Sequence, residues 1–241
     1  MPLRRVWSIV LMVTLLGMLP ACGRQVTPEP LNSNLASDMV IRYRTNGTMD
    51  FVNYTYAIVF DTCQPGTEPY PNANNTTFTS YSYAFAVGGL YAGSTITPAL
   101  FQYVLVSGSQ TQLNPVRVNN LNPATTTLVV NDNGINTEFT LTFPLATLQN
   151  PLGQIPPCPA PATPSSTWYV NFFTIDSQDR IQDSLGQFAN TDTSYQLPID
   201  TTTQAQIQVV RPAGIIGLPS NPAAQINGGE IDVYCPCLPK M

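Results

Sequence analysis

The chain has 241 residues, of which 10% are charged, and its 9 Lys or Arg residues against 14 Asp or Glu residues give a formal charge of −5. This share of charged residues is low against roughly 25% in ordinary soluble domains, and the acidic balance argues against nucleic acid as a partner. The chain contains no histidine, which excludes Ser-His-Asp and Cys-His catalysis and every metal site that needs an imidazole. A Ser-Lys dyad would need Lys240, the penultimate residue.

The N-terminal residues predict export. Two arginines precede an apolar stretch, residues 6–19, whose length is typical of a signal peptide and short for a membrane span. A Leu-Pro-Ala-Cys motif ends at Cys22 and resembles the lipobox of bacterial lipoproteins, in which the Cys thiol carries diacylglycerol and becomes the new N-terminus. The resemblance implies a signal peptide over residues 1–21, a lipid anchor on Cys22 and an extracytoplasmic location at a bacterial membrane. An ordinary signal peptide with no lipid is the alternative.

Residues 22–37 are polar and show no periodicity, which predicts a flexible tether. Alternation with period two begins just after it, where Met39, Ile41 and Tyr43 alternate with more polar residues, as in a strand with one buried face. The same alternation predicts further strands over residues 54–60, 81–87, 101–106, 168–175, 204–209 and 230–234.

A β-hairpin is predicted between residues 128–130 and 139–143, because Asn133-Gly134 between them suits the positive φ of a type I′ turn. No segment sustains a period of 3.6 residues. The sequence therefore predicts an all-β fold, a single immunoglobulin-like or jelly-roll-like β-sandwich of about nine or ten strands over residues 38–241.

Four cysteines remain when Cys22 is lipidated: Cys63, Cys158, Cys235 and Cys237. Export favours disulfides over a zinc site, which also lacks the usual CxxC spacing. Since a bond across the single proline of the tail would be strained, we expect Cys63 and Cys158 each to pair with a tail cysteine. Cys158 lies in a Pro-rich segment, residues 150–164, which we expect to be a stapled loop.

Three segments occur in a familiar order. Residues 54–61 read YTYAIVFD, residues 139–148 contain FPLATL, and residues 168–176 end in Asp before an Asp-Ser-Leu-Gly at 183–186. This order resembles the β-sandwich modules grouped as family-nine carbohydrate-binding and DOMON-like domains. The resemblance implies extracellular sugar or ligand binding. Some DOMON-like members bind haem through His and Met, and the absence of histidine argues against haem here.

Sugar sites of that family stack aromatic rings on the sugar. Trp168 lies in an apolar strand and is expected in the core, so Tyr70, Tyr91 and Tyr195 are the better stacking candidates. For each of them, a half-buried loop tyrosine is the simpler interpretation.

Acidic residues suggest two further possibilities. Asp176, Asp179 and Asp183 crowd into one turn and could bind calcium, although aspartate is common in turns without any metal.

A carboxylate pair of the kind glycosidases use could come from Asp61, Glu68, Glu138, Glu230 and Asp232. Of these, Glu230 and Asp232 are expected to form a solvent-facing stripe on a strand.

The sequence thus favours a non-catalytic structural or interaction protein of the cell envelope, with no cofactor except possible calcium. Its expected partners are the membrane, through the lipid, and an envelope protein or glycan. The alternatives are a surface carbohydrate- or ligand-binding module and a glycan hydrolase.

Overall fold

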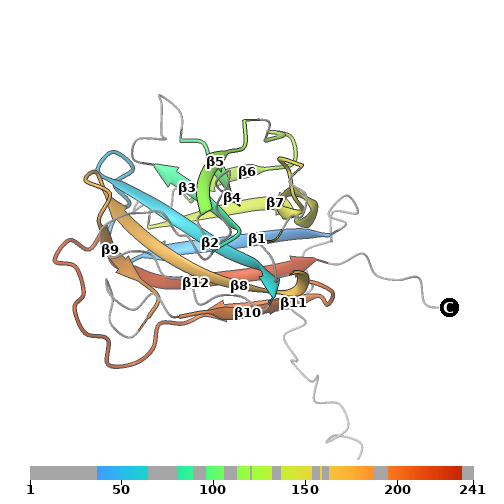
Figure 1. The fold of residues 1–241 in the computed structure, drawn as a ribbon. Coiled ribbons are helices and arrows are strands. Elements are labelled where there is room, and N and C mark those ends of the chain that lie inside the picture. The colour runs from blue at the N-terminus through green and yellow to red at the C-terminus, as the bar shows by residue number, and fades with distance from the viewer. Residues whose placement is uncertain are drawn as a thin grey trace, which may run out of the picture. The chain divides into compact units, whose positions relative to one another are not determined.

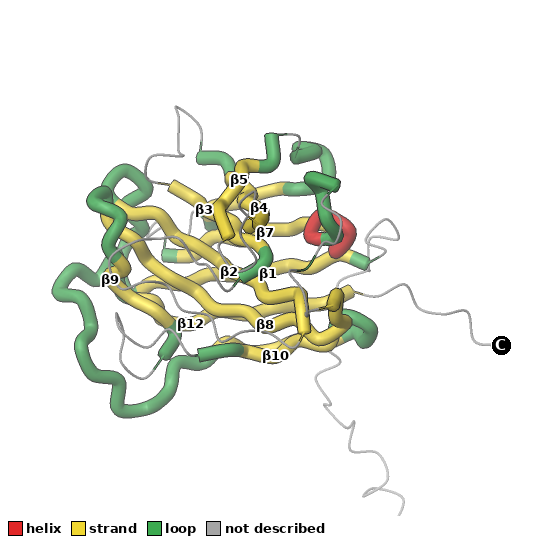
Figure 2. The backbone as a smooth tube through the Cα atoms, viewed as in Figure 1, coloured by secondary structure: helices red, strands yellow, loops and turns green. Residues whose placement is uncertain are grey.

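Two antiparallel β-sheets make up the structure, a computed structural model that describes residues 37–64, 81–88, 96–105, 113–119, 121–131, 137–153, 158, 163–186 and 195–234 (Figures 1 and 2). Within these ranges there is no α-helix, and the single helical element is a short 3-10 helix, drawn red in Figure 2. The prediction of an all-β sandwich is confirmed.

The five-stranded sheet, here sheet A, has the order β11-β12-β1-β7-β6. Its strands are β11 (Ala205–Val209), β12 (Ile226–Tyr234), β1 (Asp38–Thr45), β7 (Glu138–Pro144) and β6 (Thr127–Val130). The 3-10 helix η2 (Leu145–Leu148) follows β7 directly.

The second sheet, sheet B, has the order β10-β8-β2-β3-β4-β5, with β9 paired to β8 outside this path. Its strands are β10 (Leu197–Asp200), β8 (Thr163–Asp176), β2 (Tyr54–Gln64), β3 (Tyr83–Gly88), β4 (Ala99–Leu105), β5 (Leu113–Arg117) and β9 (Ile181–Ser184).

Aromatic side chains join the two sheets. Tyr43 of sheet A stacks on Phe172 of sheet B, with 5.0 Å between ring centroids, and on its own neighbour Phe139 at 5.2 Å. Phe143 of sheet A contacts Phe85 of sheet B at 4.8 Å. All five side chains are fully buried, and burial of each aromatic or aliphatic side chain stabilises the fold by roughly 1.5–3 kcal/mol. The period-two pattern in the sequence arises from this shared inner layer.

The register of β1 defines two ends of the sandwich. Asp38 lies opposite Tyr234 and Pro144, so the chain enters β1 at the end where β7 and β12 finish. Thr45 lies opposite Ile226 at the other end, roughly 23 Å away at a rise of ~3.3 Å per residue. The candidate site described below lies at the Asp38 end.

Most predicted strands are confirmed, and the predicted 128–143 hairpin is present as β6 and β7; its tip, residues 132–136, lies outside the described residues. Sequence patterns missed β5, β9 and β10, which are five residues or shorter. The Pro-rich loop was predicted to extend to residue 164, but β8 begins at Thr163. Its first residues pair with the end of β2, beyond a bulge between Asp61 and Cys63.

Gly229 sets the spacing of sheet A. An added Cβ at this position would lie 1.9 Å from the carbonyl oxygen of Arg42 on β1, closer than any real contact. Only glycine therefore allows β12 to pair with β1 here.

Candidate functional site

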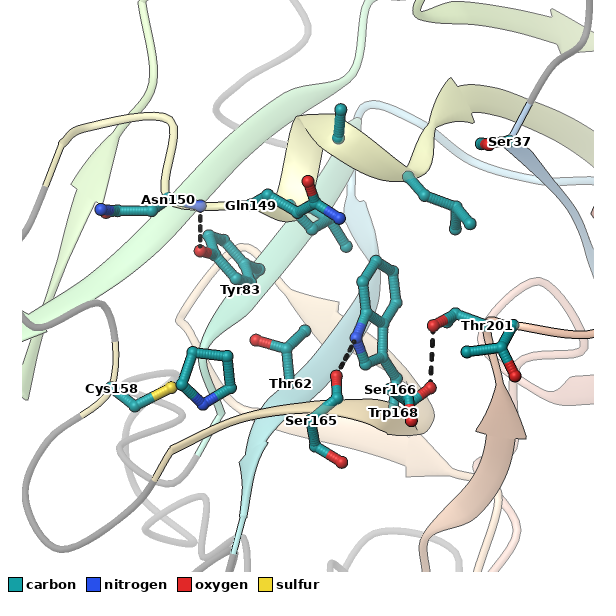
Figure 3. Close-up of a pocket in the computed structure, with 15 residues that line it drawn as sticks. Ser37, Thr62, Tyr83, Gln149, Asn150, Cys158, Ser165, Ser166, Trp168 and Thr201 are labelled. Atoms are coloured by element: carbon teal, nitrogen blue, oxygen red, sulfur yellow. Dashed lines mark hydrogen bonds between the residues drawn. The ribbon is translucent and has the colours of Figure 1, made fainter. Parts of the chain in front are cut away.

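A cavity of about 750 Å³ opens at the Asp38 end of the sandwich (Figure 3). Its volume is within the range of small-molecule sites. Its floor consists of buried side chains: Thr62, Tyr83, Leu148, Cys158 and Trp168. Its rim is exposed and includes Ala146, Gln149, Pro164, Ser166 and Thr202. The described lining thus combines an apolar, aromatic floor with an uncharged polar rim.

One wall of the cavity is the turn after η2, and buried groups hold it in place. Asn150 has a left-handed φ of 57°, and its N–H donates to the hydroxyl of Tyr83 at 2.8 Å. Gln102, which is 1% exposed, donates to the Asn150 side chain at 3.0 Å and accepts from the Leu152 N–H at 3.0 Å. Burial raises the pKa of Tyr83, opposed by the bond from Asn150, so its hydroxyl stays neutral. The wall is therefore preorganised.

The opposite wall is the start of β8. The indole N–H of Trp168 donates to the Ser165 carbonyl oxygen at 3.0 Å (Figure 3). The Ser166 carbonyl oxygen accepts from both the backbone N–H of Thr201 at 2.9 Å and its hydroxyl at 2.8 Å, which ties β8 to the end of β10. Trp168 is 4% exposed, which confirms the expectation that it belongs to the core.

A disulfide between Cys63 and Cys158 closes the floor, with 5.7 Å between the Cα atoms. This bond corrects the prediction that each of these cysteines pairs with the tail. The prediction rejected the Cys63–Cys158 pair only because it would leave Cys235 and Cys237 to each other, and both tail residues lie outside the described residues. The β2–β8 register places Cys63 opposite Pro164, which brings the preceding loop within reach.

Asp61 is a buried acid two residues before Cys63. Its Oδ1 accepts from the Cys63 N–H at 3.0 Å and from the Ser82 hydroxyl at 3.4 Å. Its Oδ2 is buried and, among the residues that the structure describes, has no hydrogen-bond partner. Burial raises the pKa of Asp61 from 3.8 to about 6, against the opposing effect of these two bonds.

The described lining of the cavity holds no Asp, Glu, Lys or Arg, and its cysteine is in a disulfide. The carboxamide of Gln149 and the hydroxyl of Ser166 have no hydrogen-bond partner among the described residues. Such a site can donate and accept hydrogen bonds over an apolar floor. It holds no group suited to proton transfer near neutral pH.

Of the three tyrosines proposed for stacking, only Tyr195 lies within the described residues. It is half-buried and packs against the main core, and burial raises its pKa. It is not among the residues that line the cavity. Tyr70 and Tyr91 lie outside the described residues, as do Cys22 and Glu68.

The three aspartates of the proposed calcium turn do not converge. Asp176 accepts hydrogen bonds from the backbone N–H and side chain of Arg180 and from the side chain of Gln182. These bonds close the turn between β8 and β9. Asp183 is fully buried and instead forms a two-point ion pair with Arg211. Within the described ranges, no group of three or more acids or cysteines could hold a metal ion.

Three of the acids considered for a glycosidase-like pair, Glu138, Glu230 and Asp232, form ion pairs on sheet A. Glu230 and Asp232 both contact the same nitrogen of Arg42 at 3.0 Å. Glu138 pairs with Arg44. The expectation that Glu230 and Asp232 form a solvent-facing stripe is wrong, because they are only 7% and 5% exposed. They lie on β12, an interior strand between β11 and β1, where long side chains of these two flanking strands contact them.

Burial raises the pKa of Asp232, and the charge of Glu230 adds to the effect. Burial acts the same way on Glu230, but a hydrogen bond from Gln206 and the charge of Arg42 outweigh it, so the pKa of Glu230 is lowered. The pair is neutralised by arginine rather than presented in the cavity.

Sequence reasoning missed Gln102 and Arg211. Neither residue belongs to a motif. Arg211 is, however, the single charged residue between positions 210 and 229, and an isolated arginine of this kind could have suggested a buried ion pair.

No known protein family, no curated protein and no solved structure matches this chain. Among the described residues, no helix is long and apolar enough to cross a membrane. The fold and cavity therefore define the class, a disulfide-linked β-sandwich with a pocket whose described lining is uncharged. The resemblance to carbohydrate-binding and DOMON-like modules stays a prediction.

Proposed function

We propose that this protein is a lipid-anchored, extracytoplasmic binding module of the cell envelope that acts by contact and not by catalysis. The observation that carries the proposal is the uncharged lining of the cavity, which offers hydrogen bonds but no acid, base or free thiol among its described residues. The lipobox-like motif ending at Cys22 supports the anchor, and a buried disulfide suits an oxidising compartment.

The anchor is tested with Cys22→Ser in the full chain. The variant should lose the lipid mass and leave the membrane fraction, because a diacyl anchor is what holds such a protein on a bilayer. Ser33→Ala in the tether is the matched control and should partition like the parent protein. An unchanged mass and partition of Cys22→Ser would defeat the anchor.

The absence of catalysis is tested by incubating the purified protein with envelope and plant polysaccharides and measuring new reducing ends. No release is expected. Hydrolysis that disappears in Asp61→Asn or Glu138→Gln would instead establish the glycan hydrolase alternative.

A carbohydrate ligand is the second candidate, favoured by the carboxamide of Gln149 and the hydroxyl of Ser166 above the apolar floor, which have no hydrogen-bond partner in the part of the chain that the structure describes. A sugar ring likewise combines an apolar face with hydroxyl groups. On an array of neutral oligosaccharides, Gln149→Ala with Ser166→Ala should weaken binding about thirtyfold, at roughly 1 kcal/mol for each of the two hydrogen bonds. Gln178→Ala with Ser220→Ala, at exposed positions outside the cavity lining, is the matched control. Array signal that is equal for both double variants would exclude the cavity as the sugar site.

A further inference from the structure

The connection between β11 and β12 exposes large apolar side chains in a way that the rest of the described surface does not. Val210, Ile216 and Leu218 are 69%, 59% and 44% exposed, within a stretch of nine residues. In Figure 1 this loop, residues 210–220, extends beyond the ends of the strands. Single exposed apolar residues are ordinary, but three within one short loop are an indication of an interaction surface.

The 210–220 loop is held in a defined shape. Arg211 at its start reaches into the fold, where it binds the buried carboxylate of Asp183 and donates to the carbonyl oxygens of Ser184 and Ile226, both at 2.7 Å. At its far end, Gln225 donates to the Pro219 carbonyl oxygen at 2.7 Å. Side-chain hydrogen bonds thus fix both ends of the loop, while the side chains of Ile216 and Leu218 between them remain exposed.

The same contacts leave the loop without available charge. Arg211 is the single charged residue between positions 210 and 229, and its side chain is 9% exposed and paired with Asp183. The centres of protein–protein interfaces are likewise depleted of charge. A bilayer surface would instead favour Lys, Arg and interfacial aromatic residues, none of which the loop presents.

The position of the loop bears on its partner. It precedes Ile226, which lies opposite Thr45, whereas the tether joins at Asp38 at the other end of β1. If the chain is anchored through Cys22, as proposed above, the loop lies at the end of β1 opposite to Asp38, the residue at which the chain from the anchor enters the sandwich. A second copy of this chain is disfavoured as the occupant, because the processed chain, without Arg4 and Arg5, keeps 7 basic against 14 acidic residues and two copies repel each other.

We propose that the 210–220 loop is the docking surface for another envelope protein, which receives Ile216 and Leu218 in an uncharged apolar groove. Because the loop already has its bound shape before it meets the partner, its conformational entropy falls little on binding. This surface is separate from the cavity, which lies at the opposite end of β1.

The test uses the full, processed chain in the cells that produce it. Ile216 is replaced by the photo-reactive p-benzoylphenylalanine, and the same probe at Val129, an apolar position on β6 that is 55% exposed, is the matched control. Irradiation should give one discrete protein adduct from position 216 and none from position 129. Mass spectrometry should identify an uncharged, apolar partner peptide at the cross-link.

Dependence on the loop is then measured with the probe kept at position 216. Val210→Asp with Leu218→Asp should reduce the adduct about tenfold or more, since each charge would enter an apolar groove, and Val129→Asp should leave it unchanged. All three substituted side chains are exposed, so thermal unfolding of the purified variants should match the parent. If it does not, Val210→Thr with Leu218→Asn replaces the aspartates.

The proposal is overturned by the absence of an adduct, by an adduct that the loop variants leave unchanged, by a charged partner peptide, or by cross-links only to lipid or to a second copy of this chain. Its failure is distinct from failure of the anchor, because Cys22→Ser reports on membrane partition alone.

Discussion

Replacing Asp61 with asparagine should abolish a specific part of the pH dependence of stability. The pKa of this carboxyl rises from 3.8 to about 6 on folding because it is buried. Between these values the folded protein holds a proton that the unfolded chain has released, so stability falls as the pH rises through this window. The loss of stability is complete above about pH 7. At 1.36 kcal/mol for each pKa unit, it amounts to about 3 kcal/mol in total.

An asparagine side chain at this position would keep an oxygen for the Cys63 N–H, which lies 3.0 Å from Oδ1 of the aspartate, but it cannot ionise. Asp61→Asn should therefore gain about 2.4 kcal/mol relative to the parent protein when the pH is raised from about 4 to about 7.5. The assay is urea unfolding at both pH values with the disulfide intact, followed by the fluorescence of Trp168. Since other carboxyls titrate in the same range, only the difference between the two proteins is interpreted.

Asp200→Asn is the control with the opposite sign. Its carboxylate is exposed and accepts hydrogen bonds from the hydroxyl and N–H of Thr202, which lower its pKa. Removing that charge should cost stability at neutral pH and not at low pH. If the unfolding free energies of Asp61→Asn and the parent protein run parallel between the two pH values, Asp61 does not carry a raised pKa and the reasoning is wrong.

Three further results are expected. Non-reducing peptide mapping should join the peptides of Cys63 and Cys158, and removing both cysteines should cost about 4–5 kcal/mol, the chain-entropy value for a cross-link with a sequence separation of 95 residues. Arg211→Met should cost about 3–5 kcal/mol in urea unfolding, because it leaves the fully buried Asp183 charged and unpaired; a cost within error of zero would contradict the buried pair. Gly229→Ala should abolish folding as judged by near-ultraviolet circular dichroism, because its Cβ would lie 1.9 Å from a carbonyl oxygen of β1, and a native spectrum would refute that packing.

The sequence alone determined the fold class, because the alternation of Met39, Ile41 and Tyr43 follows from the geometry of a single strand. It also predicted the hairpin of β6 and β7, since a turn signal acts between adjacent residues. The short strands β9 and β10 escaped, because fewer than five residues carry too little periodicity to be distinguished from a loop.

The cavity and its chemistry were decided by the tertiary structure. Gln102 and Asn150 are 48 positions apart and become partners only because β4 of sheet B packs against the turn that follows β7 of sheet A. Cys63 finds Cys158 because β2 pairs with the start of β8. Asp183, which the sequence grouped with nearby aspartates, binds Arg211 28 residues away. A local pattern reports which face of a strand is buried, but the partner of a polar or sulfur-bearing side chain depends on sheet order and register, which no local pattern contains.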